Sequence, residues 1–128
     1  MKNRGFTLRK RLNSFRYAFN GIRLLIQKEH NAWIHCAITI CVIPAGFIFN
    51  LSTTEWISII IIIGAVFSAE AINSAIEAIS DLVSPEYNES IKQTKDLAAG
   101  AVLIMAIVAV IIGLIIFIPK IIPYILNL

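Results

Sequence analysis

Apolar residues fill three long stretches of the chain, and short polar segments separate them. The stretches at 32–49, 56–80 and 96–118 each approach the length of about 20 residues that a helix needs to cross a hydrocarbon core. The first of them contains Pro44 and Gly46, which weaken its helical pattern. The pattern predicts an all-α membrane protein with three transmembrane helices.

The segment at 8–28 has a different pattern, with apolar and basic residues at helical spacing. Its apolar residues recur every three or four positions, at Leu12, Phe15, Phe19, Ile22 and Ile26. Arginines recur every seven positions along the flank of this stripe, at Arg9, Arg16 and Arg23, where they can reach anionic headgroups. The spacing predicts an amphipathic helix on the membrane surface, and a simple interfacial anchor accounts for most of it.

The second apolar stretch carries polar residues that a membrane-spanning helix does not need. At about 100° per residue, one face of this helix holds Glu70, Ser74, Glu77 and Asp81, with Asn73 at its edge. Any one of these acids could be a neutralised or hydrogen-bonded buried group. Charge inside a membrane is costly and usually serves a function, so three acids on one face favour a shared functional site.

The composition indicates a membrane protein of one domain. Of the 128 residues, 58% are hydrophobic, against roughly 45–50% in soluble domains. No linker or repeat divides the chain, so residues 1–128 are expected to form a single membrane domain. About thirty mixed residues precede the first apolar stretch, so no secretory signal peptide is expected. Three helices alone enclose little volume, which predicts a homo-oligomer.

Basic residues are distributed unevenly along the chain. Most precede the first apolar stretch, at Lys2, Arg4, Arg9, Lys10, Arg11, Arg16, Arg23 and Lys28, while Lys92 and Lys95 lie between the second and third and Lys120 follows the third. Because basic residues mark cytoplasmic loops, the N-terminus and segment 84–95 are expected in the cytoplasm. The cytoplasmic membrane surface accounts for this excess of basic residues, so no nucleic acid is expected as a partner.

The polar residues at the predicted cytoplasmic end suit phosphate chemistry. The hard oxygen ligands that Mg²⁺ prefers when it also carries phosphates are offered by Asn73, Glu77 and Asp81, and by Glu29 at the same depth on another helix. Lys95 and Asp96 begin the third stretch at the same face, and a lysine beside a metal can hold a polyphosphate. These are components of a kinase site.

Two further features define what kind of kinase this could be. None of the six glycines is followed by Lys, so a P-loop is absent from the sequence, and no kinase-type glycine loop occurs. Glu70 lies two helical turns deeper than Glu77, about 10 Å toward the bilayer centre. That depth fits a general base acting on the hydroxyl of a lipid.

Two motifs resemble those of a known family. The segment 70–81 reads EAINSAIEAISD, in the pattern E-x-x-N-[ST]-A-[IV]-E-x-x-x-D, and 95–102 reads KDLAAGAV, in the pattern K-D-x-A-x-x-A-V. Together with 15–23 and Glu29, they make the chain similar to the bacterial integral-membrane diacylglycerol kinases, a family that includes undecaprenol kinases. The resemblance covers nearly the whole chain.

The resemblance implies a homotrimer of three-span chains in the bacterial inner membrane, with an N-terminal surface helix. It also implies that active sites form between subunits on the cytoplasmic side, where the γ-phosphate of MgATP passes to a lipid alcohol. Matched position by position, the resemblance implies that Glu70 is the catalytic base and a substrate contact, with Asn73 at the reacting centre and Ala99 as a further substrate contact. It implies that Glu29 and Glu77 bind both Mg²⁺ and the nucleotide. The other implied nucleotide contacts are Lys95 and Asp96, the weaker contacts Tyr17 and Glu86, and one basic residue, Lys10 or Arg9.

The lipid acceptor is expected to be diacylglycerol, which would give phosphatidic acid, with undecaprenol as the alternative. Diacylglycerol-specific members usually carry Gly-Ser after the Lys-Asp pair, whereas this chain has Leu97 followed by Ala98 and Ala99. That departure is nearer the undecaprenol kinases. Trp33 also replaces a position that is often basic in the family.

Two other classes of protein could explain acids within a membrane. A small oligomer that conducts ions or protons would line its path with Glu70, Glu77 and Asp81. Between residues 56 and 69, however, only Ser58 and Ser68 are polar, so such a path would stop halfway. A structural subunit would explain the many small residues by close helix packing but not the buried acids.

Overall fold

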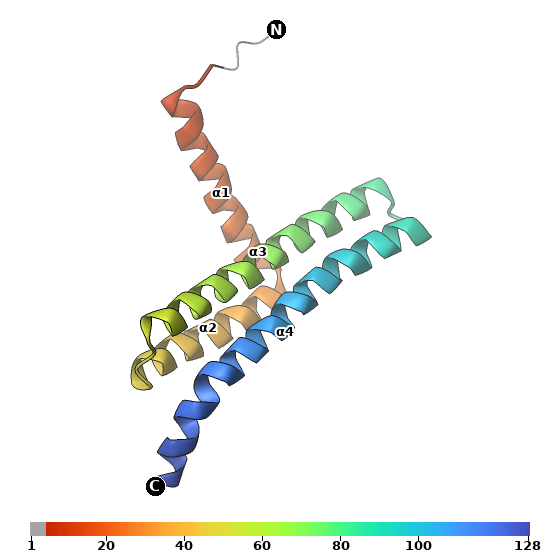
Figure 1. Ribbon diagram of the computed structural model, residues 1–128. Coiled ribbons are helices and arrows are strands. Elements are labelled where there is room, and N and C mark those ends of the chain that lie inside the picture. The colour runs from red at the N-terminus through yellow and green to blue at the C-terminus, as the bar shows by residue number, and fades with distance from the viewer. Residues whose placement is uncertain (1–4) are drawn as a thin grey trace.

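The computed structural model describes residues 5–128, and every element in that range is a helix, which confirms the all-α prediction. The four helices are α1 (Leu8–Lys28), α2 (His30–Ile48), α3 (Thr53–Val83) and α4 (Glu89–Leu126). Helices α2, α3 and α4 lie side by side, and α3 and α4 run along each other over the greatest length (Figure 1). Helix α1 leaves this bundle near its junction with α2. Lys2 and Arg4, which contribute to the predicted orientation, lie outside the described residues.

Three helices are long and apolar enough to cross a membrane, as predicted: α2 with 19 residues, α3 with 31 and α4 with 38. By helix rise, α3 and α4 are about 47 and 57 Å long, well beyond a hydrocarbon core of about 30 Å. Helix α4 begins before the predicted start at 96, because Asn88 caps it by accepting a hydrogen bond from the Ile91 backbone N–H at 3.2 Å. The extra turns extend the helix into a polar segment.

Prolines lie inside two of the spanning helices without ending them. Pro44 is in α2, and Pro119 and Pro123 are in α4. A proline removes one backbone hydrogen bond from a helix. In a membrane-spanning helix this loss is tolerated, because neighbouring helices and side chains can satisfy the backbone group that the proline leaves without a partner. The first span therefore forms as a continuous helix despite Pro44.

The turn between α2 and α3 is fixed by local hydrogen bonds. Asn50 has a φ of 52°, a left-handed conformation that Asn adopts more readily than most residues. Ser52 and Glu55 form a capping box, with N–O distances of 2.9 and 3.2 Å. Glu55 also pairs with Lys120 at 3.1 Å, which connects the start of α3 to the end of α4.

Apolar side chains pack tightly at this end of the bundle. Leu51, Ile59 and Ile116 form a buried cluster, with Trp56 packed against it. A Cβ atom on Gly46 would lie 2.6 Å from the Trp56 ring, so a larger residue there would have to displace this ring from its packing position. The polar residues of α3 lie toward the opposite end of the bundle, where α3 and α4 join.

Candidate functional site

Glu70 is the largest side chain that the structure buries completely, with 1% of its surface exposed. It lies on α3 and faces α2, where Nε2 of His35 is 3.2 Å from its Oε1. Its other oxygen, Oε2, is buried and has no hydrogen-bond partner among residues 5–128. The carboxylate is thus held by one oxygen while the second remains available to a group from outside the chain.

The next turn of α3 adds two more buried polar atoms that lack a hydrogen-bond partner within residues 5–128. Asn73 Oδ1 and Ser74 Oγ have no hydrogen-bond partner within the described part of the chain. The Nδ2 of Asn73, whose side chain is nearly buried, approaches Oε1 of Glu77 at 3.5 Å. A buried polar group left unsatisfied costs about 1–3 kcal/mol. With Glu70 Oε2, these atoms are the only buried unpartnered side-chain oxygens or nitrogens found between residues 5 and 128, which indicates a place for a ligand or a second copy.

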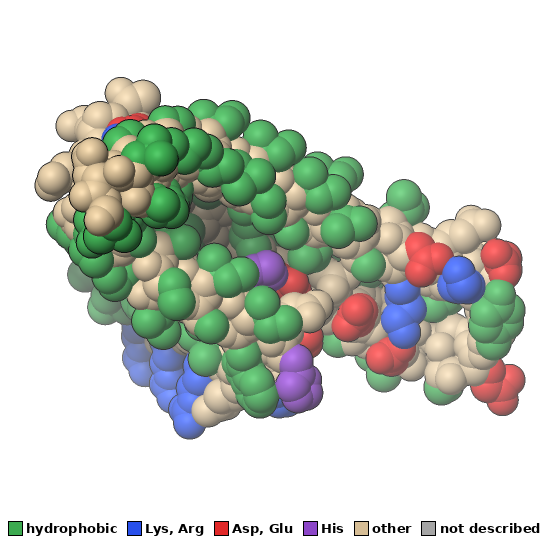
Figure 2. Space-filling view, turned by 90° about the horizontal axis from the view of Figure 1, so that it is seen from below, with side chains coloured by type: hydrophobic (Ala, Val, Ile, Leu, Met, Phe, Trp, Pro, Cys, Tyr) green, Lys and Arg blue, Asp and Glu red, His purple; other side chains and the backbone are tan. Residues whose placement is uncertain are grey.

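Charged side chains meet at the end of the molecule where α3 and α4 join. Nζ of Lys95 on α4 donates a hydrogen bond to Oδ1 of Asp81 on α3 at 2.7 Å. Lys92 and Asp96 form a second pair at 2.7 Å, one helical turn apart on α4. Figure 2 shows acidic side chains gathered toward this end, whereas hydrophobic side chains cover the other. Within the described part of the chain, the two predicted nucleotide contacts on α4 are thus each in an ion pair, Lys95 with Asp81 and Asp96 with Lys92.

Burial decreases along the predicted acidic face of α3. Glu70 is buried, Glu77 is half-buried and Asp81 is exposed. The Glu70 end of this row contacts α2 through His35, and the Asp81 end contacts α4 through Lys95. The row therefore leads from a position enclosed by helices to a charged, exposed surface.

Glu29 is the single residue between α1 and α2 and is half-buried. Its backbone N–H bonds to the Leu25 carbonyl at 3.1 Å. Within residues 5–128, no group of three or more His, Cys, Asp or Glu side chains is close enough to hold a metal ion. The donor chemistry still fits Mg²⁺, because this ion often takes only one or two carboxylates and completes its coordination with phosphates and water. Glu77 and the unpartnered Oδ1 of Asn73 are donors of that kind.

Glu86 and Ala99, two other predicted contacts, lie on the exposed surface. Glu86 is in the loop between α3 and α4, where its carbonyl accepts a hydrogen bond from Ser84 Oγ at 2.9 Å. In the same loop, Tyr87 donates a hydrogen bond to Glu89, which raises the pKa of the tyrosine above its usual value. Ala99 is exposed on α4.

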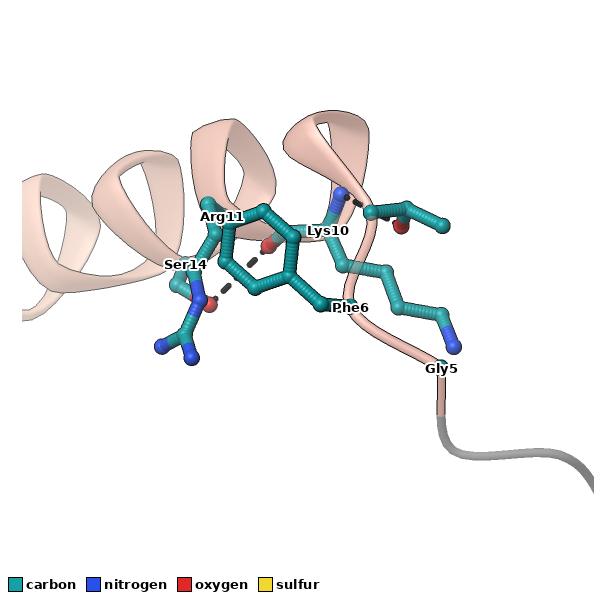
Figure 3. A pocket seen from close by; sticks show the side chains of 6 residues that line it. Gly5, Phe6, Lys10, Arg11 and Ser14 are labelled. Carbon is teal, nitrogen blue, oxygen red and sulfur yellow. Dashed lines mark hydrogen bonds between the residues drawn. The ribbon is translucent and has the colours of Figure 1, made fainter.

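The predicted contacts on α1 are not brought to the acidic row within one chain. Lys10 and Tyr17 are exposed on the part of α1 that leaves the bundle. Figure 3 shows the first turn of α1, where the Lys10 carbonyl accepts a hydrogen bond from Ser14 Oγ at 3.0 Å and the Lys10 side chain extends past Gly5. The Arg11 guanidinium lies over the Phe6 ring, 5.2 Å from its centre. Roles for Lys10 and Tyr17 therefore stay predictions that require another copy of the chain.

The sequence interpretation did not include His35. Its ring and that of Phe67 pack in a T-shaped arrangement, with ring centres 6.1 Å apart, and its Nε2 contacts Glu70. A signal for it was present, because a histidine inside a predicted span is itself an ionisable residue in the membrane. Its partner lies 35 positions away on another helix, so periodicity along one helix could not reveal the pair.

The fold and the buried carboxylate define a multi-pass membrane protein with a polar site within its spanning helices. A family model for prokaryotic diacylglycerol kinase matches residues 16–117, and the chain belongs to this family. It is therefore a lipid kinase.

Named relatives support this assignment and differ in their lipid. The chain is 41% identical over 113 residues to an undecaprenol kinase of Bacillus subtilis (strain 168), covering 88% of this chain and 92% of the relative. It is 38% identical over 103 residues to a diacylglycerol kinase of Synechocystis sp., covering 80% of this chain and 59% of the relative. It is 28% identical over 107 residues to a diacylglycerol kinase of Haemophilus influenzae, covering 83% and 91%.

Proposed function

We propose that the protein transfers the γ-phosphate of ATP to the hydroxyl of a membrane lipid, with Glu70 as the general base. The observation that carries this proposal is the buried Glu70 carboxylate, whose Oε1 contacts His35 and whose Oε2 has no hydrogen-bond partner within residues 5–128. In the proposed step, Oε2 takes the proton of the acceptor hydroxyl. The acceptor oxygen then forms a bond to the γ-phosphorus, the bond between the β-γ bridging oxygen and the γ-phosphorus breaks, and ADP leaves.

Glu77, Asn73 and Glu29 are proposed to hold the Mg²⁺ that accompanies ATP. When bound, this ion would neutralise phosphate charge. Lys95, Asp96 and Glu86 are proposed as nucleotide contacts, since they lie at the charged end of the same row or in the adjoining loop. We propose that the Lys95 ammonium exchanges its contact with Asp81 for a phosphate when the nucleotide binds.

We propose a polyprenol such as undecaprenol as the acceptor, with diacylglycerol as the second candidate. The undecaprenol kinase is matched at 41% identity over 92% of its length, a higher identity than that of either diacylglycerol kinase. The pair Ala98 and Ala99, in place of Gly-Ser, agrees with this choice. The expectation of diacylglycerol from the sequence stays open, because two relatives carry that name.

A homotrimer in the bacterial inner membrane, with the N-terminus and the α3–α4 loop in the cytoplasm, completes the proposal. The orientation is supported by the basic residues of α1 and of the segment before residue 96. Assembly is supported by the buried polar atoms of α3 that have no partner within residues 5–128. A neighbouring copy could bring Lys10 and Tyr17 of its α1 near the acidic row.

The structure adds an argument against an ion-conducting pore. Beyond Glu70, toward the α2–α3 turn, the buried side chains of α3 are Val66, Ile62 and Ile59. These apolar residues continue the face that holds Glu70, and they would block ions or protons rather than conduct them.

The proposed activity is tested with purified protein in mixed micelles and ATP that carries a radioactive label at either the γ or the α phosphorus. We expect the γ label to enter lipid and the α label to remain in nucleotide. Undecaprenol should react about tenfold faster or more than diacylglycerol or ceramide, because a difference of even one methylene group in an apolar pocket is worth about 10- to 200-fold. Faster labelling of diacylglycerol would reassign the acceptor, and labelling of no lipid would contradict the function.

Asp81→Asn tests the proposed release of Lys95. We expect this change to lower the KM for ATP by about 1.4- to 5-fold, because an exposed ion pair contributes about 0.2–1 kcal/mol that nucleotide binding no longer has to overcome. An ATP titration of the initial rate measures it, with Glu89→Gln, an exposed acid at the start of α4, as the control. A higher KM in Asp81→Asn would instead place Asp81 among the groups that bind the nucleotide.

A further inference from the structure

His35 is a polar residue of α2 for which the proposed mechanism has not yet given a task. Its ring lies between Glu70, at 3.2 Å from Nε2 to Oε1, and an apolar cavity of about 300 Å³ between α2, α3 and α4. Every other side chain that lines this cavity is apolar, among them Ile38, Val66 and Phe67. His35 is thus the one polar group where the cavity meets the buried carboxylate.

We propose that His35 is a positioning residue for phosphoryl transfer, whose Nε2–H holds Oε1 of Glu70 so that Oε2 faces the acceptor hydroxyl. This inference rests on the proposed role of Glu70 as base. A carboxylate can only accept hydrogen bonds, so the contact requires the proton on Nε2 in either charge state of the ring. Only a group in this place could fix the carboxylate, since Glu70 has no other hydrogen-bond partner within the described residues.

The surroundings keep the histidine ring in place. It packs against the Phe67 ring in a T-shaped arrangement with an interplanar angle of 74°, and its Nε2 contacts Oε1 of Glu70 at 3.2 Å. The His35 side chain is 18% exposed, and Glu70 is 1% exposed. Little water can compete for Oε1, so loss of the Nε2–H would leave a buried carboxylate free to rotate.

The proposed role moves no proton through His35. The acceptor proton goes to Oε2 of Glu70, and His35 donates to Oε1 before and after transfer. Its contribution is orientation, and a misplacement of about 1 Å at a reacting group can cost on the order of 100-fold in rate. Removing the donor should therefore lower kcat and leave nucleotide binding unchanged, because the nucleotide is proposed to bind at the far end of the row.

The test compares kcat and KM of purified variants in mixed micelles, with thermal unfolding of each. His35→Leu and His35→Phe remove the donor, and His35→Gln keeps an N–H that can reach Glu70. His30→Leu is the matched control, because His30 packs on Trp33 at the start of α2, with ring centres 4.7 Å apart. We expect the donor-less variants to lose about 10- to 100-fold in kcat with the KM for ATP within about twofold, and His35→Gln to recover most of the rate.

A double-variant comparison separates positioning from a purely structural role. In Glu70→Gln the base is already absent, so adding His35→Leu should cause no further loss of kcat. An equal loss from His35→Leu in both backgrounds, or a kcat within twofold of the unchanged protein in the single variant, would overturn the proposal. Failure of both donor-less variants to fold, beside a normally folded His35→Gln, would show a structural role and overturn it as well. Full activity of Glu70→Gln would instead contradict the proposed base, a result distinguishable from a failure at His35 alone.

Discussion

Glu70→Gln is expected to lower kcat for lipid phosphorylation by about 10²- to 10⁴-fold, the contribution typical of a general base. The amide keeps the size of the side chain but cannot take the acceptor proton. MgATP binding should persist, because Glu77 and Lys95 lie at the other end of the row from the buried Glu70 carboxylate. The rate of γ-phosphate transfer and equilibrium binding of MgATP, measured on the same preparation, check both parts.

Glu55→Gln is the matched control for this experiment. Glu55 is also an acid of α3, but it caps the helix at the α2–α3 turn, far along the helix from Glu70. Its substitution should leave kcat within about twofold, since no reacting group is proposed near it. Equal activity of Glu70→Gln and the unchanged protein would refute the base assignment. Loss of MgATP binding together with kcat would place Glu70 among the nucleotide or metal ligands instead.

Glu77→Gln is expected to raise the Mg²⁺ concentration needed for half-maximal activity by about tenfold or more. Loss of an outer-shell partner alone costs about 10- to 100-fold in metal affinity, and a carboxylate that binds the metal directly should cost at least as much. Glu77 is half-buried, and its Oε1 accepts a hydrogen bond from Asn73 Nδ2 at 3.5 Å, so the two side chains proposed to hold the ion lie beside each other. A Mg²⁺ titration at saturating ATP and lipid measures the change.

The control for Glu77 is again Glu89→Gln, which removes one negative charge from the same end of the molecule. It corrects for the general effect of charge on cation concentration near the surface. The Mg²⁺ titration of this control should match that of the unchanged protein. A Glu77→Gln titration that also matched would remove Glu77 from the metal site and leave Glu29 and Asn73 as the candidates.

The helices could be predicted from the sequence because their signal is local. Runs of apolar residues at 32–49, 56–80 and 96–118 correspond to α2, α3 and α4, and the motif at 70–81 identified the family. The full length of α4 was missed at both ends. The polar turns before residue 96 are helical through a cap at Asn88 rather than through apolar periodicity, and beyond residue 118 the helix continues to Leu126 although it contains Pro119 and Pro123.

Contacts between helices could not be predicted in the same way. The pairs His35 with Glu70 and Lys95 with Asp81 join residues 35 and 14 positions apart, and which helices meet at these points depends on packing. A single chain also leaves the predicted contacts of α1 away from the row. Those residues depend on how copies assemble, which helix periodicity within one chain does not encode.

The most direct measurement of the central claim is an experimental structure of the assembled protein in lipid, with Mg²⁺, a non-hydrolysable ATP analogue and a polyprenol. The proposal predicts that the acceptor hydroxyl lies about 2.6–3.2 Å from Oε2 of Glu70, with the γ-phosphate on its other side. A hydroxyl placed beside Asp81 or Asp96, with Glu70 of every copy out of reach, would contradict it.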